Sequence, residues 1–134
     1  MAITAVLSQK EMERVAGLAY EGQAIRVSLA YDPGDTLSSE DTVATWDASK
    51  VSGGGYADFT DTIGTGAYDV ADQRYEMPQI DAAFTATGAG FTFNKVYVVI
   101  GSELYLHSLT TENPAIIMAA GQTQTYRIVL ATDD

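Results

Sequence analysis

The sequence predicts a mainly β domain of the β-sandwich or jelly-roll kind, with one short N-terminal helix and a long loop excursion rich in Gly and Asp. Two observations lead to this fold class. The apolar part of the chain, residues 78–132, divides into strand-like segments, namely IDAAFTA, FTFNKVYVVIG, ELYLHSL, PAIIM and QTYRIVLAT. Glycines at 88, 90, 101 and 121 separate these segments and permit the positive φ of tight connections. Closely spaced strands with glycine turns are typical of a sandwich or barrel.

The segment VYVVI at 96–100 is the centre of this predicted β core. It has no charged residue and is rich in β-branched side chains, so we expect both of its faces to be covered. The last segment alternates instead, with Tyr126, Ile128 and Leu130 on one side and Thr125, Arg127 and Val129 on the other.

A chain of 134 residues is most simply one domain, 1–134, with room for a sizeable core. Within it we expect an N-terminal segment with a helix at 1–22, a strand at 23–31, an acidic loop excursion at 32–77 and the β core at 78–134. Seven basic side chains against eighteen acidic ones give a net charge of −11. A surface with this much negative charge repels phosphate backbones and anionic lipids. We therefore expect neither nucleic acid nor a membrane as a partner.

The sequence has no cysteine, which excludes disulfides, iron–sulfur clusters and thiolate zinc sites. The N-terminus lacks the basic and apolar regions of a secretory signal. No window approaches the roughly 18 to 20 apolar residues of a spanning helix. We therefore expect a soluble protein whose fold depends on packing.

The N-terminal helix is predicted at residues 9–20. Ser8-x-x-Glu11 has the form of a capping box, in which the Ser accepts from the N3 amide and the Glu reaches back. An apolar stripe at helical spacing follows, formed by Met12, Val15, Ala16 and Ala19. A helix that covers a sheet face is favoured over a partner-binding helix.

The strand after this helix alternates. Ile25, Val27, Leu29 and Tyr31 lie on one side, and Arg26, Ser28 and Ala30 on the other. This pattern is typical of a half-buried strand. The sequence Asp-Pro-Gly-Asp at 32–35 then predicts a turn.

Residues 32–77 form the predicted excursion. Nine carboxylates lie between Asp32 and Asp72, with Lys50 as the one basic residue among them. No hydrophobic period is sustained, although a short strand or a helical turn near 41–46 is compatible with the pattern. Its aromatic residues argue against simple disorder. We expect this excursion to pack on the sandwich or on a neighbouring subunit.

No catalytic constellation is recognisable. His107, the one histidine, has no nucleophile or orienting carboxylate at a known spacing, so an ordinary sheet histidine is favoured. The acidic residues offer the hard oxygen ligands of calcium, but they do not match the EF-hand loop and are favoured as solvated charge. They are Asp32, Asp35, Glu40, Asp41, Asp58, Asp61, Asp69 and Asp72. We therefore expect no enzyme activity, metal or cofactor.

The aromatic residues of the excursion are the candidate functional residues. Aromatics provide large contact area with a polar group at one end, which suits a protein interface or a sugar platform. An interface is favoured, formed by Trp46, Tyr56, Phe59, Tyr68 and Tyr75.

Several stretches of the sequence resemble small virion structural proteins of tailed bacteriophages, particularly cyanophage-type ones. They are WDASKVSGGGY at 46–56, GTGAYD at 64–69, FTATGAGFTFNKVYVVIG at 84–101 and AAGQTQTYRIVLATDD at 119–134. Proteins of this kind decorate or cement the head, or belong to the tail and its fibres. They are non-enzymatic and β-rich and assemble as oligomers, often trimers. The resemblance implies a virion location and partners that include further copies of the chain and the major capsid or tail protein.

We therefore expect a structural virion protein, most simply an exterior capsid decoration or cement protein. A tail or tail-fibre component is an alternative within the same class. The alternative outside it is a carbohydrate- or receptor-binding β-module that uses exposed aromatics beside carboxylates. An enzyme stays an alternative because a small β fold does not decide function. It is the least favoured alternative because the sequence has no Ser–His or metal signature.

Overall fold

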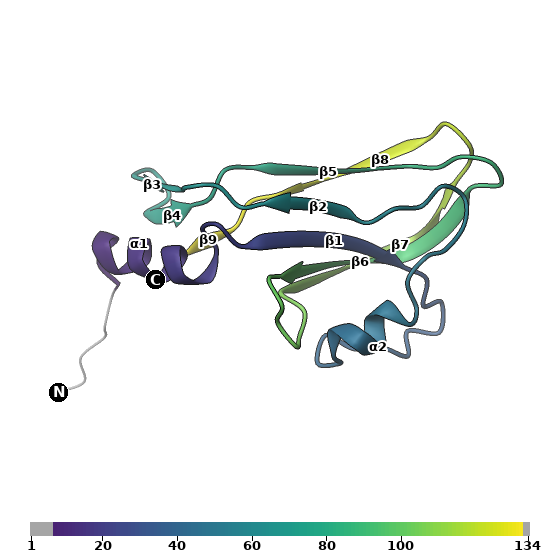
Figure 1. The fold of residues 1–134 in the computed structure, drawn as a ribbon, viewed down its shortest axis with the longest axis horizontal. Helices are drawn as coiled ribbons and strands as arrows, with labels where there is room; N and C mark the ends of the chain where they lie inside the picture. Colours follow the sequence, from purple (N-terminus) through teal and green to yellow (C-terminus); the bar gives the residue numbers. More distant parts are fainter. Residues whose placement is uncertain (1–6, 133–134) are drawn as a thin grey trace. The chain divides into compact units, whose positions relative to one another are not determined.

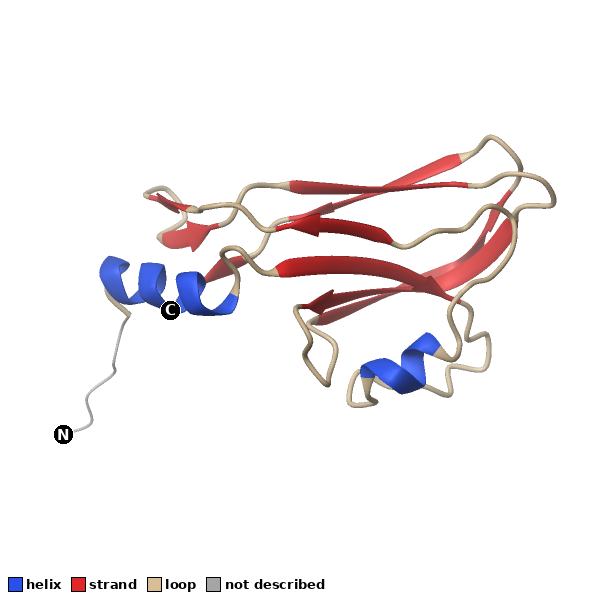
Figure 2. Ribbon diagram, in the orientation of Figure 1, coloured by secondary structure: helices blue, strands red, loops and turns tan. Residues whose placement is uncertain are grey.

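A computed structural model describes residues 7–132 of the chain. Contacts divide the chain into two compact units, and the expectation of one domain over 1–134 stays a prediction. Among the described residues, unit 1 comprises 7–23, 62–80 and 127–132, and unit 2 comprises 24–61 and 81–126. Residues 1–6 and 133–134 of the predicted segments lie outside the described residues. Taken over the described residues, the chain is mainly β, as predicted (Figure 2).

Unit 1 contains α1 (Gln9–Ala19) and a three-stranded antiparallel sheet. Its strands are β3 (Ala67–Asp69), β4 (Arg74–Glu76) and β9 (Ala131–Thr132), in the order β3-β4-β9. The helix is confirmed, with the Ser8 side chain accepting from the Glu11 amide. Glu11 does not close the second half of the expected capping box with its carboxylate, which instead accepts two hydrogen bonds from Arg14. Met12 and Ala16 are buried.

Unit 2 is built on the sheet β2-β1-β6-β7, labelled in Figure 1. Its strands are β2 (Phe59–Thr62), β1 (Ala24–Ala30), β6 (Phe91–Ile100) and β7 (Ser108–Met118), and β1 and β7 both pair antiparallel with β6. A two-stranded sheet joins β5 (Ile80–Thr85) to β8 (Thr123–Ile128). The helix α2 (Val43–Asp47) lies within the segment 32–77.

Both faces of the central strands are buried. Val96 to Ile100 are each at most 6% exposed, which confirms the prediction for VYVVI. One face of the sheet packs against α2, where Trp46 meets Ala30, Tyr97 and Val99. Figure 1 shows β5 and β8 on the side of this sheet away from α2. The sandwich-like arrangement therefore has strands on one side of the central sheet and α2 on the other.

Three local expectations were wrong. The strand β1 is not half-buried: Ser28 and Ala30, on its supposed polar face, are 0% exposed because α2 and its flanking loops cover them. ELYLHSL is not a strand of its own: it begins in a turn and bridge after β6, and its last residues join PAIIM in the single long strand β7. Residues 32–77 are not one loop: α2 lies where a helical turn was compatible with the pattern, and the strands β2, β3 and β4 follow it.

Candidate functional site

The aromatic residues expected at an interface lie mostly inside their own chain. Trp46 is 0% exposed, its indole Nε1 donates to the Ser38 carbonyl at 2.9 Å, and its ring lies 5.5 Å from that of Tyr97. Tyr75 is 6% exposed and donates to the Gly66 carbonyl at 2.9 Å. Neither side chain has surface left for a partner, so their expected interface role is not supported. Tyr56, Phe59 and Tyr68 are half-buried.

Tyr56 is engaged within unit 2 along its whole length. Its ring stacks on Phe84 at 6.1 Å and meets the edge of Phe91 at 5.6 Å. Its hydroxyl accepts from the Leu29 amide at 2.9 Å and donates to Asp58 at 2.5 Å. Burial, and then the bond to Asp58, raise the pKa of this phenol well above its ordinary value. Tyr56 therefore stays a neutral packing residue.

A charged network joins α2 to the central sheet. The Arg26 guanidinium on β1 donates to both carboxylate oxygens of Asp47 on α2, at 3.0 and 3.1 Å. The Tyr97 hydroxyl on β6 donates to the same Asp47 carboxylate at 2.7 Å. Burial pushes the pKa of Asp47 upward, but the bonds from Arg26 and Tyr97 outweigh it, so the pKa lies below its ordinary value. Asp47 is therefore ionised at neutral pH.

Asp58 organises the neighbouring half of this network. Its carboxylate accepts from Ser28 at 2.8 Å, from Tyr56 at 2.5 Å and from the Lys50 ammonium at 2.9 Å. Here too the hydrogen bonds outweigh burial, and the pKa of Asp58 is lowered. Within residues 7–132, every buried side-chain nitrogen or oxygen has a hydrogen-bond partner. With ionised acids and neutral phenols already bonded to one another, this network offers a clamp rather than a nucleophile or base.

Sequence reasoning missed the network because Arg26 was assigned to a polar, solvent-facing side of β1. A signal was nevertheless present in the sequence. Arg26 and Ser28 alternate with apolar residues in a strand that pairs with the chargeless VYVVI segment. A polar residue beside a strand buried on both faces must find a partner.

Three carboxylates gather on the β3–β4 hairpin of unit 1. Ligand oxygens of Asp69, Asp72 and Glu76 lie within 4.8 Å of one another. Asp69-x-x-Asp72 was visible in the sequence as an acidic pair, and the hairpin adds Glu76. Asp69 also accepts from the Ala71 amide at 2.9 Å, and the Arg74 Nε donates to Glu76 at 2.5 Å. Two of the three carboxylates therefore already have protein donors.

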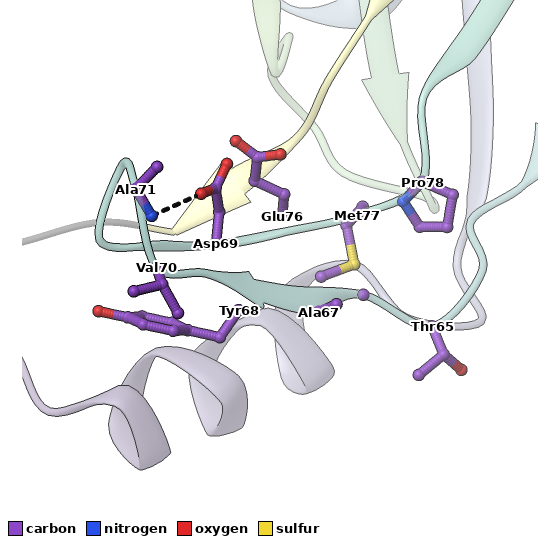
Figure 3. Close-up of a pocket in the computed structure, with 10 residues that line it drawn as sticks. Thr65, Ala67, Tyr68, Asp69, Val70, Ala71, Glu76, Met77 and Pro78 are labelled. Atoms are coloured by element: carbon purple, nitrogen blue, oxygen red, sulfur yellow. Dashed lines mark hydrogen bonds between the residues drawn. The ribbon is translucent and has the colours of Figure 1, made fainter.

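Figure 3 shows the hollow beside this acidic group, with a volume of about 590 Å³. Asp69 and Glu76 project from one side of the hairpin, whereas Tyr68 and Val70 project from the other. Carboxylates at this spacing suit a hard cation such as Ca²⁺. The arrangement is equally that of solvated acids on an exposed hairpin, since Asp72 is exposed.

Two of the other predicted acidic residues serve the local fold. Asp32 is 6% exposed and accepts from Thr36 and the Leu37 amide, while Asp41 accepts from the Ser38 amide. The His107 side chain is exposed, with its Nδ1 3.3 Å from the Ser108 hydroxyl.

Exposed apolar side chains flank the β7 edge of the central sheet. Among the described residues β7 pairs only with β6, so its other edge is open. Leu104 and Tyr105, in the loop before β7, are 61% and 53% exposed, and Ile117 near its end is 77% exposed. The loop is held in place because the Leu104 carbonyl accepts from the Val43 amide at 2.9 Å. We call Leu104, Tyr105, Ile117 and the open edge of β7 the β7 surface.

No family model, curated protein or solved structure matches this chain. In the part of the chain that the structure describes, none of the helices has the length and apolar character to span a bilayer.

Proposed function

We propose that this chain is a non-enzymatic structural component of a tailed-phage virion, most simply an exterior capsid decoration or cement protein that assembles as an oligomer. The β7 surface is the observation that carries the proposal. An open sheet edge is a template for pairing with another chain, and large exposed apolar side chains lie near both ends of this one. The preceding loop is already held by a backbone hydrogen bond, so little ordering opposes such an association.

Two further features support a structural role. In the charged network described above, Arg26 binds Asp47, and Lys50 and Ser28 bind Asp58. These side chains therefore stabilise the fold. The net charge of −11 would keep assembled particles apart by like-charge repulsion at low salt. The sequence resemblance to small virion proteins points to the same class.

The assembly part is tested by light scattering on the purified chain over a range of concentrations. We expect a closed oligomer whose mass falls toward that of the monomer in the Ile117→Lys variant. Val70→Lys is the matched control, because Val70 is 79% exposed, also β-branched, and belongs to the β3–β4 hairpin. An oligomer that survives Ile117→Lys but dissociates with Val70→Lys would show that the β7 surface is not the interface.

The location is tested by immunogold electron microscopy on purified virions of the encoding phage. Label on the head surface is expected for a decoration protein. Label confined to the tail or fibres would favour the alternative within the class. Virions that carry no label and lack the chain by mass spectrometry would contradict a virion role altogether.

A further inference from the structure

A bulge between β6 and β7 opens a small cavity in unit 2. The register joins Phe93 to Ile116 and Lys95 to Thr111, so Asn94 alone on β6 faces residues 112–115 on β7. The extra residues push β7 outward and leave a cavity of about 300 Å³. This volume lies at the small end of ligand-binding pockets, which suits a single ring rather than a chain.

The wall opposite the bulge is fixed by a reciprocal contact. The Asn94 side-chain oxygen accepts from the Asp32 amide at 2.7 Å, and its side-chain nitrogen donates to the Asp32 carbonyl at 2.9 Å. The Asp32 carboxylate in turn accepts from the Leu37 amide at 2.9 Å. The turn after β1 therefore has its shape before any ligand arrives, which lowers the entropy lost on binding.

The floor of the cavity is a buried lysine with donor capacity to spare. Lys95 is 3% exposed, and its ammonium contacts Asp35 at 2.5 Å and the Thr111 hydroxyl at 3.1 Å. An ammonium has three N–H donors, and these two acceptors are those it meets among the described residues. A third acceptor, supplied by a ligand, would therefore stabilise this buried ammonium by one more charge-assisted hydrogen bond. Asp35, which contacts this lysine, has φ 52°, a left-handed conformation that is uncommon outside glycine.

The remaining walls combine acceptors with an aromatic ring. Asp35 has a largely exposed carboxylate, with 77% of its side chain accessible. Glu112 accepts from the Tyr126 hydroxyl at 2.8 Å through one oxygen and lines the cavity. Tyr31, which is 45% exposed, lines the same cavity.

From this arrangement we propose that the cavity binds one saccharide unit. A sugar hydroxyl both donates and accepts, so a single ring can accept from Lys95 and donate to Asp35 and Glu112. Its C–H face can pack on the Tyr31 ring. The charges disfavour the alternatives. A basic ligand would place a second cation near Lys95, and an anion would meet the carboxylates of Asp35 and Glu112. The inference stands apart from the virion role, since it uses none of the β7 surface residues.

The test is titration of the ¹⁵N-labelled chain with glucose, galactose, mannose and N-acetylglucosamine, followed by amide chemical shifts. We expect saturable shifts for at least one sugar, with a Kd on the order of 1 mM, centred on residues 94–95 and 111–115. Tyr31→Ala should weaken this binding about tenfold. Val129→Ala is the control, because it removes a similarly exposed apolar side chain outside the cavity and should leave the Kd unchanged.

Three outcomes would overturn the proposal. One is the lack of saturable shifts with all four sugars. Another is binding that Tyr31→Ala leaves intact or that shifts amides elsewhere in the chain. The third is a set of shifts at 94–95 and 111–115 with N-acetylarginine amide or sulfate but not with sugars, which would assign the cavity to a basic side chain or to an anion instead.

Discussion

Arg26 and Asp47 are joined by two parallel hydrogen bonds of 3.0 and 3.1 Å, across 21 residues of sequence. This two-pronged geometry fixes the orientation of both side chains, unlike a single contact between point charges. It holds α2 on the face of the central sheet where Trp46 packs. Tyr97 strengthens the arrangement by donating to Asp47, and its ring lies 5.9 Å from the guanidinium carbon of Arg26.

Arg26→Met should therefore lower the free energy of unfolding by about 1–3 kcal/mol, because it leaves Asp47 without its cation in a partly desolvated place. The side chains are 23% and 35% exposed, so the loss should fall short of that for a fully buried pair. Urea unfolding followed by circular dichroism measures it. Lys10→Met is the control, since the Lys10–Glu13 pair is 88% and 46% exposed, and it should change stability by less than about 0.5 kcal/mol. Equal effects of the two variants would contradict the clamp.

The pH dependence of stability should report the ionised state of Asp47. Its folded pKa is lowered, so between the folded and unfolded pKa values the unfolded chain binds more protons. The stability that Asp47 contributes is thus complete above the unfolded value of about 3.9 and is lost as the pH falls through the folded pKa.

Asp47→Asn should be less stable than the wild type at pH 7, with a difference that shrinks as the pH falls below about 4. Urea unfolding at several pH values between neutrality and strong acid gives both curves. Glu40→Gln, at an exposed position, should stay within about 0.5 kcal/mol of the wild type throughout. If the difference in unfolding free energy between Asp47→Asn and the wild type does not change with pH, the charge of Asp47 does not contribute to stability.

Trp46→Ala should destabilise the folded chain by about 3–5 kcal/mol, because it empties a large, fully enclosed site. Trp46→Phe loses the hydrogen bond to Ser38 but keeps an aromatic ring in the site. Its free energy of unfolding should therefore fall by less than that of Trp46→Ala. Circular dichroism melts measure stability, and light scattering on the fraction that remains folded measures assembly. Weakened assembly with undiminished stability would restore the interface role that the sequence suggested for Trp46.

Local signals in the sequence were sufficient for some elements. The S-x-x-E pattern and the Met12–Ala16 spacing located α1 within one residue of its end. The chargeless run at 96–100 identified the strand buried on both faces. The signals for α1 lie within a few residues of one another. The burial of 96–100 follows from the composition of that strand alone.

Pairings between distant residues could not be predicted in this way. Trp46 looked exposed because its surroundings are acidic and glycine-rich, yet its neighbour in space is Tyr97 on β6. Glu76 joins Asp69 only through the register of the β3–β4 hairpin. The cavity over Lys95 depends on a bulge that the apolar pattern of β7 does not reveal. Side-chain period indicates which face a residue occupies, but it does not indicate what covers that face.

Two adjacent glycines allow a close backbone approach to be separated from backbone conformation. Gly53 and Gly54 both have positive φ, 78° and 58°. A Cβ on Gly53 would meet nothing within 4 Å, whereas one on Gly54 would lie 2.1 Å from the Gly90 carbonyl oxygen. The Thr87 amide donates to the Gly54 carbonyl at 2.8 Å, which holds the two segments together.

Gly53→Ala should therefore lower the free energy of unfolding by about 1–2 kcal/mol, which is the cost of an alanine in the left-handed conformation. Gly54→Ala should lower the free energy of unfolding by more than about 3 kcal/mol, because the new Cβ must also displace the backbone at Gly90. Urea unfolding of the two variants under identical conditions compares them directly. Because φ is left-handed at both positions, the difference between the variants isolates the contact with Gly90. Equal losses would mean that the segments at 53–55 and 87–90 separate without cost, and that their contact does not stabilise unit 2.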